Sequence, residues 1–448
     1  MTAVHATEVF VRRDFTLLSR ADTSALLPAR VALVAALIAA PWAFGAVDGW
    51  AWMSLGLAAC LTLLLWIARV VREKIVRLTW TPLYVPLTAF FLLALAQYFT
   101  GHTLDKAETC QALVLLTVDA TLFFTAVQLF GENAGHSRRW FGLSVLVFAG
   151  VLGLFAILQF ASGAQRIYWT FDTPGTFFGP YSNPDHYAGL MEMLAPVAVC
   201  YIASQRNKYS VGVLLLLSSA ATVAITSLLL TGSRGGLLAL FSEVAIAGVL
   251  FRRRAQGSNK WSVTASLAGS ALAVFMLFCW IDPGWAAQKL ETIIDVPSQM
   301  WMNATEFRKT AALDSLHMLR DYPVFGVGLG NFELAYPRYQ SFPSDLSVDY
   351  AHDDYVQAMA ETGLVGAGLI VFSVALFFRL AFHNADSRLK AGRGWIQMGA
   401  TLGCCGLLVH SFVDFNLHVP ANAAWFAALA GIAVKAGRTT SRPPNLWR

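Results

Sequence analysis

The sequence predicts an all-α polytopic membrane protein. Its 448 residues are 56% hydrophobic and only 13% charged, whereas a soluble domain carries roughly 25% charged residues. Apolar runs close to the roughly 20 residues that cross a bilayer recur along the whole chain. We therefore expect about twelve transmembrane helices, at residues 31–47, 50–68, 82–99, 109–130, 140–160, 188–203, 211–230, 235–251, 262–281, 355–378, 394–415 and 419–436.

The basic residues predict which helix ends face the cytoplasm. With a cytoplasmic N-terminus, most of the 32 Lys and Arg residues fall on one side, as the positive-inside rule requires. Both termini are then cytoplasmic, and the loop at 282–354 lies outside. Leu313 and Leu319 have helical spacing in this loop, and Pro323 ends that helix. The basic residues do not cluster on one face, so we expect the lipid bilayer and no nucleic acid as a partner.

Three regions follow from this map. Residues 1–281 form an N-terminal membrane region of about nine helices, 282–354 form the outer loop, and 355–448 hold about three helices and a cytoplasmic tail. The N-terminus lacks a cleavable signal pattern. The six cysteines lie in or at the ends of apolar segments without metal-site spacing, and we interpret them as small buried hydrophobes.

Two arginines on the outer side are candidates for anion binding. In "LTGSRGGLLAL", Arg234 begins a helix among glycines, where backbone N–H groups and the helix dipole attract anions. Its guanidinium also matches phosphate geometry. The alternative is an arginine whose side chain extends to the lipid headgroups. Arg308 lies near the start of the loop helix, and spacing alone describes it as a solvated charge. "GVGLGNF" lacks the Gly-Lys-Ser/Thr of a nucleotide loop and predicts a tight turn.

The stretch "DYAHDDYVQAMAETGLVG" places His352 at the outer mouth of a membrane helix. Asp353 and Asp354 suit its cap and first turn. A neutral imidazole at such a position is what a general base requires, and an interfacial polar histidine is the alternative. Oxygen and nitrogen ligands from His352, Asp353 and Asp354, with Asp185, His186 or Asp414, would also suit a metal, but no spacing demands one. We expect no metal and no other cofactor.

Carboxylates inside apolar segments raise a further question. Asp119, Glu192 and Glu243 each lie within an expected helix, where charge is expensive and often functional. A hydrogen bond between helices explains them equally well. Asn183-Pro184 predicts a turn, and Asp185 is expected to cap the helix that follows.

Five segments together resemble a known family. In this order they are "GTFFGPYSNPDHYAGLMEMLAP", "TGSRGGLLAL", "DYPVFGVGLGNF", "AHDDYVQAMAETGLVG" and "VHSFVDFNLHVPANA". They resemble the signature segments of the bacterial O-antigen ligase and polymerase superfamily. The resemblance covers roughly residues 160–425, and its last two segments are the most specific.

The resemblance implies a glycosyltransferase of the bacterial inner membrane with a GT-C-like architecture and a periplasmic active site. Its donor would be a glycan on undecaprenyl pyrophosphate. In the ligases the acceptor is lipid A–core oligosaccharide, and the reaction inverts the anomeric carbon without a metal. The helix-mouth histidine of the family matches His352, which would activate the acceptor hydroxyl. Its pyrophosphate-binding arginines match Arg234 and Arg308.

Further residues in the matching segments are expected to support this site. They are Asp185, His186, Glu192, Asp353, Asp354, Tyr355, Gln357, Asp414, Asn416 and His418. One departure from the family is Asp353, where members often carry asparagine.

Three other functions stay open at this point. A polymerase or a protein O-oligosaccharyltransferase of the same superfamily would differ only in the acceptor. A lipid-linked sugar transporter would use Asp119, Glu192 and Glu243 as a proton relay. Such transporters often contain related halves, which this sequence does not display.

Overall fold

The structure is a computed structural model that describes residues 25–74, 76–131, 135–173, 175–254, 304–342, 348–383, 389, 394–434 and 440–442. The expected span 262–281 and the first part of the outer loop, up to 303, lie outside the described residues. So does the boundary expected at 281–282.

Each expected span within the described residues overlaps a helix. Six of these helices are long and apolar enough to cross a membrane: α3 (Gly49–Glu73), α5 (Lys106–Phe130), α6 (Gly135–Ala161), α7 (Pro184–Gln205), α8 (Val211–Leu230) and α14 (Asp354–Phe382). Four shorter apolar helices join them: α2 (Leu27–Trp42), α4 (Tyr84–Thr100), α16 (Trp395–His410) and α17 (Pro420–Ala433). The helix α9 (Arg234–Arg254) completes the set. The chain is therefore a predominantly helical multi-pass membrane protein.

The centre of the bundle is built from α7, α16 and α17. The helix α16 packs against α7, α9 and α17, and α17 also packs against α5. Small residues allow this close approach: a Cβ added at Gly403 would lie 2.5 Å from the backbone oxygen of Met193. Trp425 is fully buried, and its indole donates a hydrogen bond to the Leu37 carbonyl oxygen at 2.7 Å.

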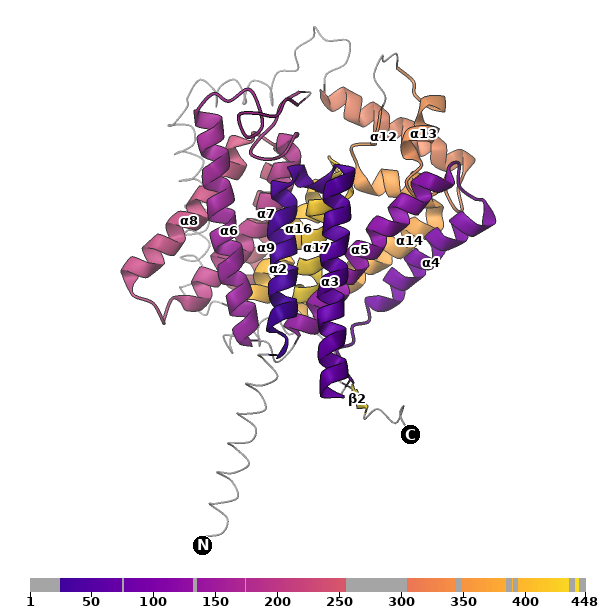
Figure 1. Cartoon of the computed structure of the whole chain (residues 1–448). Coiled ribbons are helices and arrows are strands. Elements are labelled where there is room, and N and C mark those ends of the chain that lie inside the picture. Colours follow the sequence, from indigo (N-terminus) through magenta and orange to yellow (C-terminus); the bar gives the residue numbers. More distant parts are fainter. Residues whose placement is uncertain are drawn as a thin grey trace.

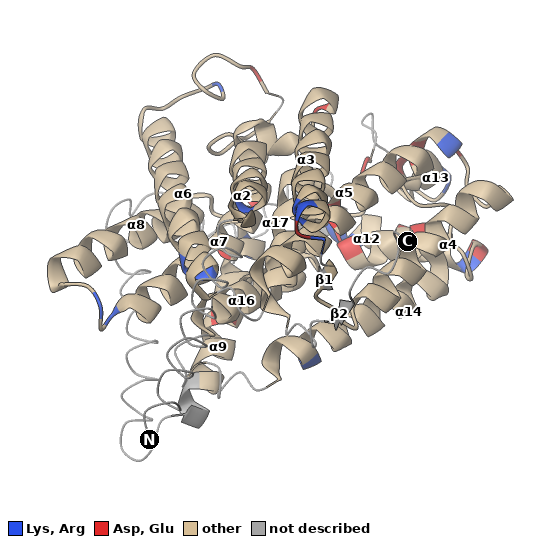
Figure 2. Ribbon diagram, turned by 60° about the horizontal axis from the view of Figure 1, so that its bottom comes forward, with Lys and Arg blue, Asp and Glu red and all other residues tan. Residues whose placement is uncertain are grey.

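The outer helices present apolar side chains away from the protein. Leu57, Leu64 and Leu216 are each more than half exposed, and most of the ribbon in Figure 2 carries no charge. This surface suits lipid. It also corrects the expectation for two cysteines, since Cys60 and Cys110 are exposed on faces of α3 and α5 that point away from the core.

The described part of the outer loop lies at one end of the helical body, and the short strands β1 (Val76–Leu78) and β2 (Thr440–Arg442) pair at the other (Figure 1). The loop contains α12 (Ala304–Asp321), α13 (Phe332–Ala335) and the 3₁₀ turn η2 (Tyr336–Arg338). The helix α12 ends before Pro323, as predicted, and packs against α14.

A glycine turn after α12 fastens this loop to a break in α14. The break is at Gly363, with φ of 66° and ψ of −167°. Leu364 N donates to the Pro323 carbonyl oxygen at 2.8 Å, and Gly328 N donates to that of Glu361 at 3.0 Å. The turn thereby satisfies backbone groups that the broken helix leaves unpaired. "GVGLGNF" is thus a tight turn, as expected, with positive φ at Gly326, Gly328 and Gly330.

Candidate active site

Three helix starts and one turn meet at the end of the bundle that carries α12 (Figure 1). The starts are those of α7, α9 and α14, and the turn is Ser411–Phe415, followed by η3 (Asn416–His418). This turn exists because α16 ends at His410 rather than at residue 415, where the apolar run ends. Asn183, not Asp185, is the N-cap of α7: its side-chain oxygen accepts from Asp185 N at 2.8 Å. Asp185 is thereby left free to pair elsewhere.

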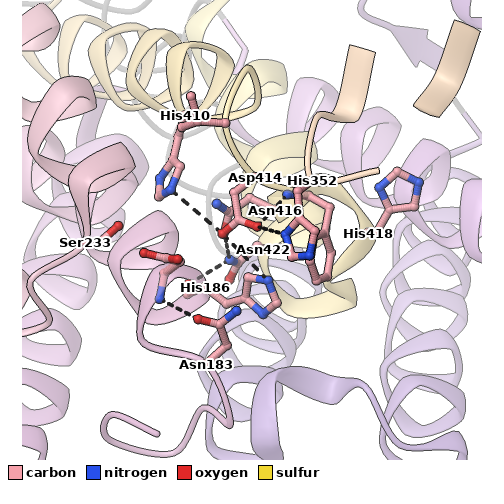
Figure 3. Close-up of polar contacts among 12 residues, drawn as sticks. Asn183, His186, Ser233, His352, His410, Asp414, Asn416, His418 and Asn422 are labelled. Carbon is pink, nitrogen blue, oxygen red and sulfur yellow. Dashed lines mark hydrogen bonds and ion pairs between the residues drawn. The ribbon is translucent and has the colours of Figure 1, made fainter. Parts of the chain in front are cut away.

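Asp414 lies at the centre of the site, with its side chain fully buried (Figure 3). Its Oδ1 is 3.5 Å from His352 Nδ1. Its Oδ2 is 3.9 Å from His186 Nε2 and 4.0 Å from His410 Nε2. Burial by itself would raise the pKa of Asp414. The contact with His352 and the charges of His186 and Arg308 outweigh burial and hold that pKa well below its usual range.

Arg308 reaches this centre from the loop helix α12. Its Nη2 is 2.7 Å from Asp185 Oδ2, and its Nη1 donates to the Val413 carbonyl oxygen at 3.1 Å. The guanidinium therefore bridges the start of α7 and the turn after α16. The spacing in the sequence predicts only a solvated charge at Arg308, and the fold places this residue close to Asp414.

His352 stands immediately before the N-cap of α14 in an uncommon backbone conformation. Its φ of 53° lies in the left-handed region, which costs a non-glycine residue about 1–3 kcal/mol. The imidazole is 22% exposed. It lies against the ring edges of Phe307 and Phe415, with centroid distances of 5.6 and 4.9 Å. This backbone conformation therefore points the partly exposed imidazole of His352 toward Asp414.

Arg234 begins α9 at the same end of the bundle, and its side chain is exposed. The Ser233 hydroxyl accepts a hydrogen bond from Gly236 N at 3.1 Å and so caps the helix. A Cβ added at Gly235 would lie 2.3 Å from the His410 ring. The first turn of α9, which carries Arg234, therefore rests on a residue of the Asp414 cluster.

Glu192 and His410 form a buried pair behind Asp414. His410 Nδ1 is 3.0 Å from Glu192 Oε2, and both side chains are almost fully buried. The sequence predicts a role for Glu192 but gives no clear signal for His410, whose spacing of four residues from Asp414 would place both on one face of the helix expected at 394–415. The pair explains Glu192 structurally. No contact among the described residues joins Asp119 to Glu192 or Glu243 in a continuous relay.

A second polar group surrounds Asp354 in the first turn of α14. Its Oδ1 is 2.7 Å from His418 Nδ1, and its Oδ2 accepts from the Ser411 hydroxyl at 2.7 Å. Gln357 Nε2 lies 3.2 Å from His418 Nε2. Burial alone would lower the pKa of His418, but the hydrogen bond and charge of Asp354 outweigh it and raise that pKa.

Amides fix the backbone around these groups. Asn422 Nδ2 donates to the His186 carbonyl oxygen and to Asn416 Oδ1, both at 2.9 Å. The Tyr181 hydroxyl donates to Asn422 Oδ1 at 3.0 Å. The Asn416 amide oxygen is therefore occupied by Asn422 and does not line the site. Asn416 instead helps to fix the backbone around it.

Two expected residues have structural contacts of their own. Asp353 caps α14, because its Oδ1 accepts from Tyr355 N and Val356 N, both at 3.0 Å. The Tyr355 hydroxyl donates to the Leu408 carbonyl oxygen at 2.7 Å. Both residues fix the start of α14, and with it His352.

The site also contains a geometry that a cation would fit. Ligand atoms of Asp185, His410 and Asp414 lie within 4.8 Å of one another. Arg308 pairs with Asp185, however, and Glu192 pairs with His410. The arginine therefore already supplies the positive charge that a divalent ion would bring.

Residues 219–371 match the protein-family model described as O-antigen ligase. This match over part of the chain supports the resemblance to the O-antigen ligase and polymerase superfamily. No curated protein matches the sequence. Together with the apolar helices, the match supports a membrane enzyme with activity of the O-antigen ligase or polymerase kind.

The superfamily match includes the three principal site residues. Arg234, Arg308 and His352 all lie within it, whereas His410, Asp414 and His418 lie beyond its end. In the structure the turn between α16 and α17, which lies outside the match, contributes Asp414 to the same cluster of side chains as His352.

The Glu192–His410 pair makes a stability prediction. Glu192→Ala should lower the free energy of unfolding by about 3–5 kcal/mol, because it leaves one polar partner buried and alone. Glu243→Gln is the control, since Glu243 is also buried but its Oε1 has no hydrogen-bond partner, and it should change stability by no more than about 1 kcal/mol. Unfolding in detergent micelles measures both, and equal losses would contradict the pairing.

Proposed function

We propose that the chain is an O-antigen ligase: it transfers an O-antigen glycan from undecaprenyl pyrophosphate to lipid A–core oligosaccharide. The observation that carries this proposal is the convergence of His352 and Arg308 on the buried Asp414, with Arg234 on the neighbouring helix start. A base and two guanidinium groups are the parts that this transfer requires.

In the proposed reaction, His352 accepts the proton of the acceptor hydroxyl. The hydroxyl oxygen then attacks the anomeric carbon from the face opposite the pyrophosphate, which inverts that carbon. The bond between the anomeric carbon and the pyrophosphate oxygen breaks, and undecaprenyl pyrophosphate leaves with the bonding electrons. Arg234 and Arg308 stabilise the negative charge that develops on it, and Asp414 stabilises the imidazolium that forms on His352.

The arginines also support a reaction without a metal. A divalent cation normally offsets the charge of a leaving pyrophosphate. Arg308 takes that place beside Asp185. Asp185 holds the guanidinium until the pyrophosphate arrives and competes for it. Transfer should therefore continue at full rate in EDTA.

The wider topology belongs to the same proposal. It comprises about twelve spans in a GT-C-like architecture in the bacterial inner membrane. Both termini lie in the cytoplasm, and the active site faces the periplasm. The regions are 1–281, 282–354 and 355–448. The joint location of α12 and the starts of α7, α9 and α14 at one end of the body supports a single outer active face.

Glycan transfer by the purified protein tests the proposal. The donor is undecaprenyl-pyrophosphate glycan, and three acceptors are offered in parallel with EDTA: lipid A–core, a second lipid-linked glycan and a protein. We expect the glycan on lipid A–core. Product on the second glycan would mean a polymerase, and product on the protein an oligosaccharyltransferase. Loss of activity in EDTA that a divalent ion restores would overturn the metal-free mechanism.

The buried Asp414 predicts a pH dependence of stability. Asp414 has a folded pKa below the ordinary value of about 3.9, so its contribution to stability is present above that value and is lost only as pH falls through the folded pKa. Asp414 is therefore an anion throughout the neutral and mildly acid range. Asp414→Asn should lower the free energy of unfolding at neutral pH and make it fall less steeply in acid than that of the wild type. Unfolding in detergent micelles at a series of pH values measures both, and an equal acid dependence of the two proteins would contradict the prediction.

A further inference from the structure

A cavity of about 350 Å³ adjoins the site at Gln357 and His418. It is bounded by α5, α14 and the glycine turn, and its wall includes Tyr350, Gln357 and His418. Small-molecule sites measure about 300–1,000 Å³, so the cavity has room for roughly one or two sugar rings.

Acidic side chains dominate the polar lining of this cavity. Five carboxylates line it, from Glu108, Asp119, Glu333, Asp349 and Glu361, and no lysine or arginine is among its described lining residues. Glu361 is held in place by Gly330 N, which donates to it at 2.9 Å. Asp119 faces the cavity from α5 and makes no hydrogen bond or ion pair with the described residues.

The acidic groups act on one another across the cavity mouth. Burial raises the pKa of Glu333, and the charges of Asp349 and Glu108 raise it further. Burial, Asp349 and Glu361 raise the pKa of Tyr350 in the same way. The cavity mouth therefore has a negative potential, as expected for like charges close together.

Aromatic and imidazole rings separate this cavity from the arginine side. Tyr350 lines the cavity and stacks on Phe415 with centroids 4.1 Å apart. Phe415 in turn contacts His352 at 4.9 Å and His186 at 4.6 Å. His418 stands 5.5 Å from Tyr350 on the same wall. His352 is thus between a basic side and an acidic side.

We propose that this cavity holds the acceptor sugar and selects sugars without negative charge, either neutral or carrying an amine. The inference rests on the proposed transfer reaction and adds the chemical class of the acceptor. Carboxylates accept strong hydrogen bonds from sugar hydroxyls, and the Tyr350 ring, which lines the cavity, offers an apolar face to a sugar ring. A phosphate or uronate would face five carboxylates, and the one basic side chain among the described lining residues, His418, is already paired with Asp354. The anionic donor and an acceptor without negative charge would therefore reach His352 through different surroundings, one basic and one acidic.

Three acceptors that differ only in charge test this inference. Each is the same lipid A–core oligosaccharide, ending in glucose, glucosamine or glucose 6-phosphate, and all receive glycan from one undecaprenyl-pyrophosphate donor. Like-charge contacts in a desolvated site are costly. We therefore expect wild-type kcat/KM for the phosphorylated acceptor to be at least about tenfold below that for glucose.

The double variant Glu333→Gln/Asp349→Asn removes two mouth charges outside the membrane helices and keeps the side-chain shapes. The ratio of kcat/KM for the glucose acceptor to that for the phosphorylated acceptor should fall to about threefold or less. The change should appear in the acceptor KM, and the donor KM should stay the same. Asp172→Asn is the matched control, because Asp172 is 80% exposed and pairs with Arg166.

The outcomes separate the two proposals. Equal use of all three acceptors by the wild type, or unchanged discrimination in the double variant, would overturn the acceptor assignment and leave the transfer reaction standing. A change in donor KM alone would overturn it as well, since the cavity would then bind the donor. A wild-type protein that transfers to none of the three would overturn the proposed function and this inference with it.

Discussion

Replacing His352 with alanine should lower kcat of glycan transfer by about 10²- to 10⁴-fold, the contribution of a positioned general base. Nothing else that the structure brings beside Asp414 can take its place. His186 and His410 are almost fully buried, whereas His352 is partly open. Steady-state transfer to lipid A–core measures the loss.

His317→Ala is the matched control for this substitution. His317 is an exposed histidine on α12, in the same outer loop as His352, and its loss should leave kcat within about twofold of wild type. Donor KM should be unchanged in His352→Ala, because the imidazole acts on the acceptor. A near-normal kcat in His352→Ala would mean that another group is the base, and it would overturn the mechanism.

Much of the fold was predictable because lipid imposes one strong rule on sequence. A membrane helix must be apolar over roughly 20 residues, so the runs at 109–130 and 211–230 coincide with α5 and α8 almost to the residue. The rule fails at the end of α16. The run to residue 415 is apolar enough to continue, but the helix stops at His410, and the turn that follows carries Asp414.

The candidate site was only partly predictable, because its residues come from distant segments. His352 stood out through its place at a helix start, and the glycines around Arg234 marked that helix end. Arg308 carries no such local signal, and its contact with Asp185 spans 123 positions along the chain. The Glu192–His410 pair and the wall formed by Tyr350 and Phe415 likewise depend on tertiary packing, which local patterns do not describe.

Replacing Arg308 with alanine should lower kcat/KM for the donor by about 10²- to 10³-fold, the usual effect of losing one group that stabilises developing charge. The loss should appear in kcat as well as in donor KM, because the pyrophosphate gains charge as its bond to the sugar breaks. Arg308→Lys should restore part of the activity but not all of it. Lysine keeps the charge and lacks the forked geometry that reaches both Asp185 and the Val413 carbonyl.

The neighbouring Lys309 shows whether this effect is local. Lys309 is exposed on the same helix, so Lys309→Ala removes an equal charge from the loop and should change donor kcat/KM by no more than about twofold. If donor kcat/KM fell equally in the two alanine variants, the loop would act through its overall charge, and the position of Arg308 would not matter. A loss confined to Arg308 would mean that the guanidinium must stand beside Asp414. Asp414 would then orient both the guanidinium that binds the donor and the imidazole that acts as the base.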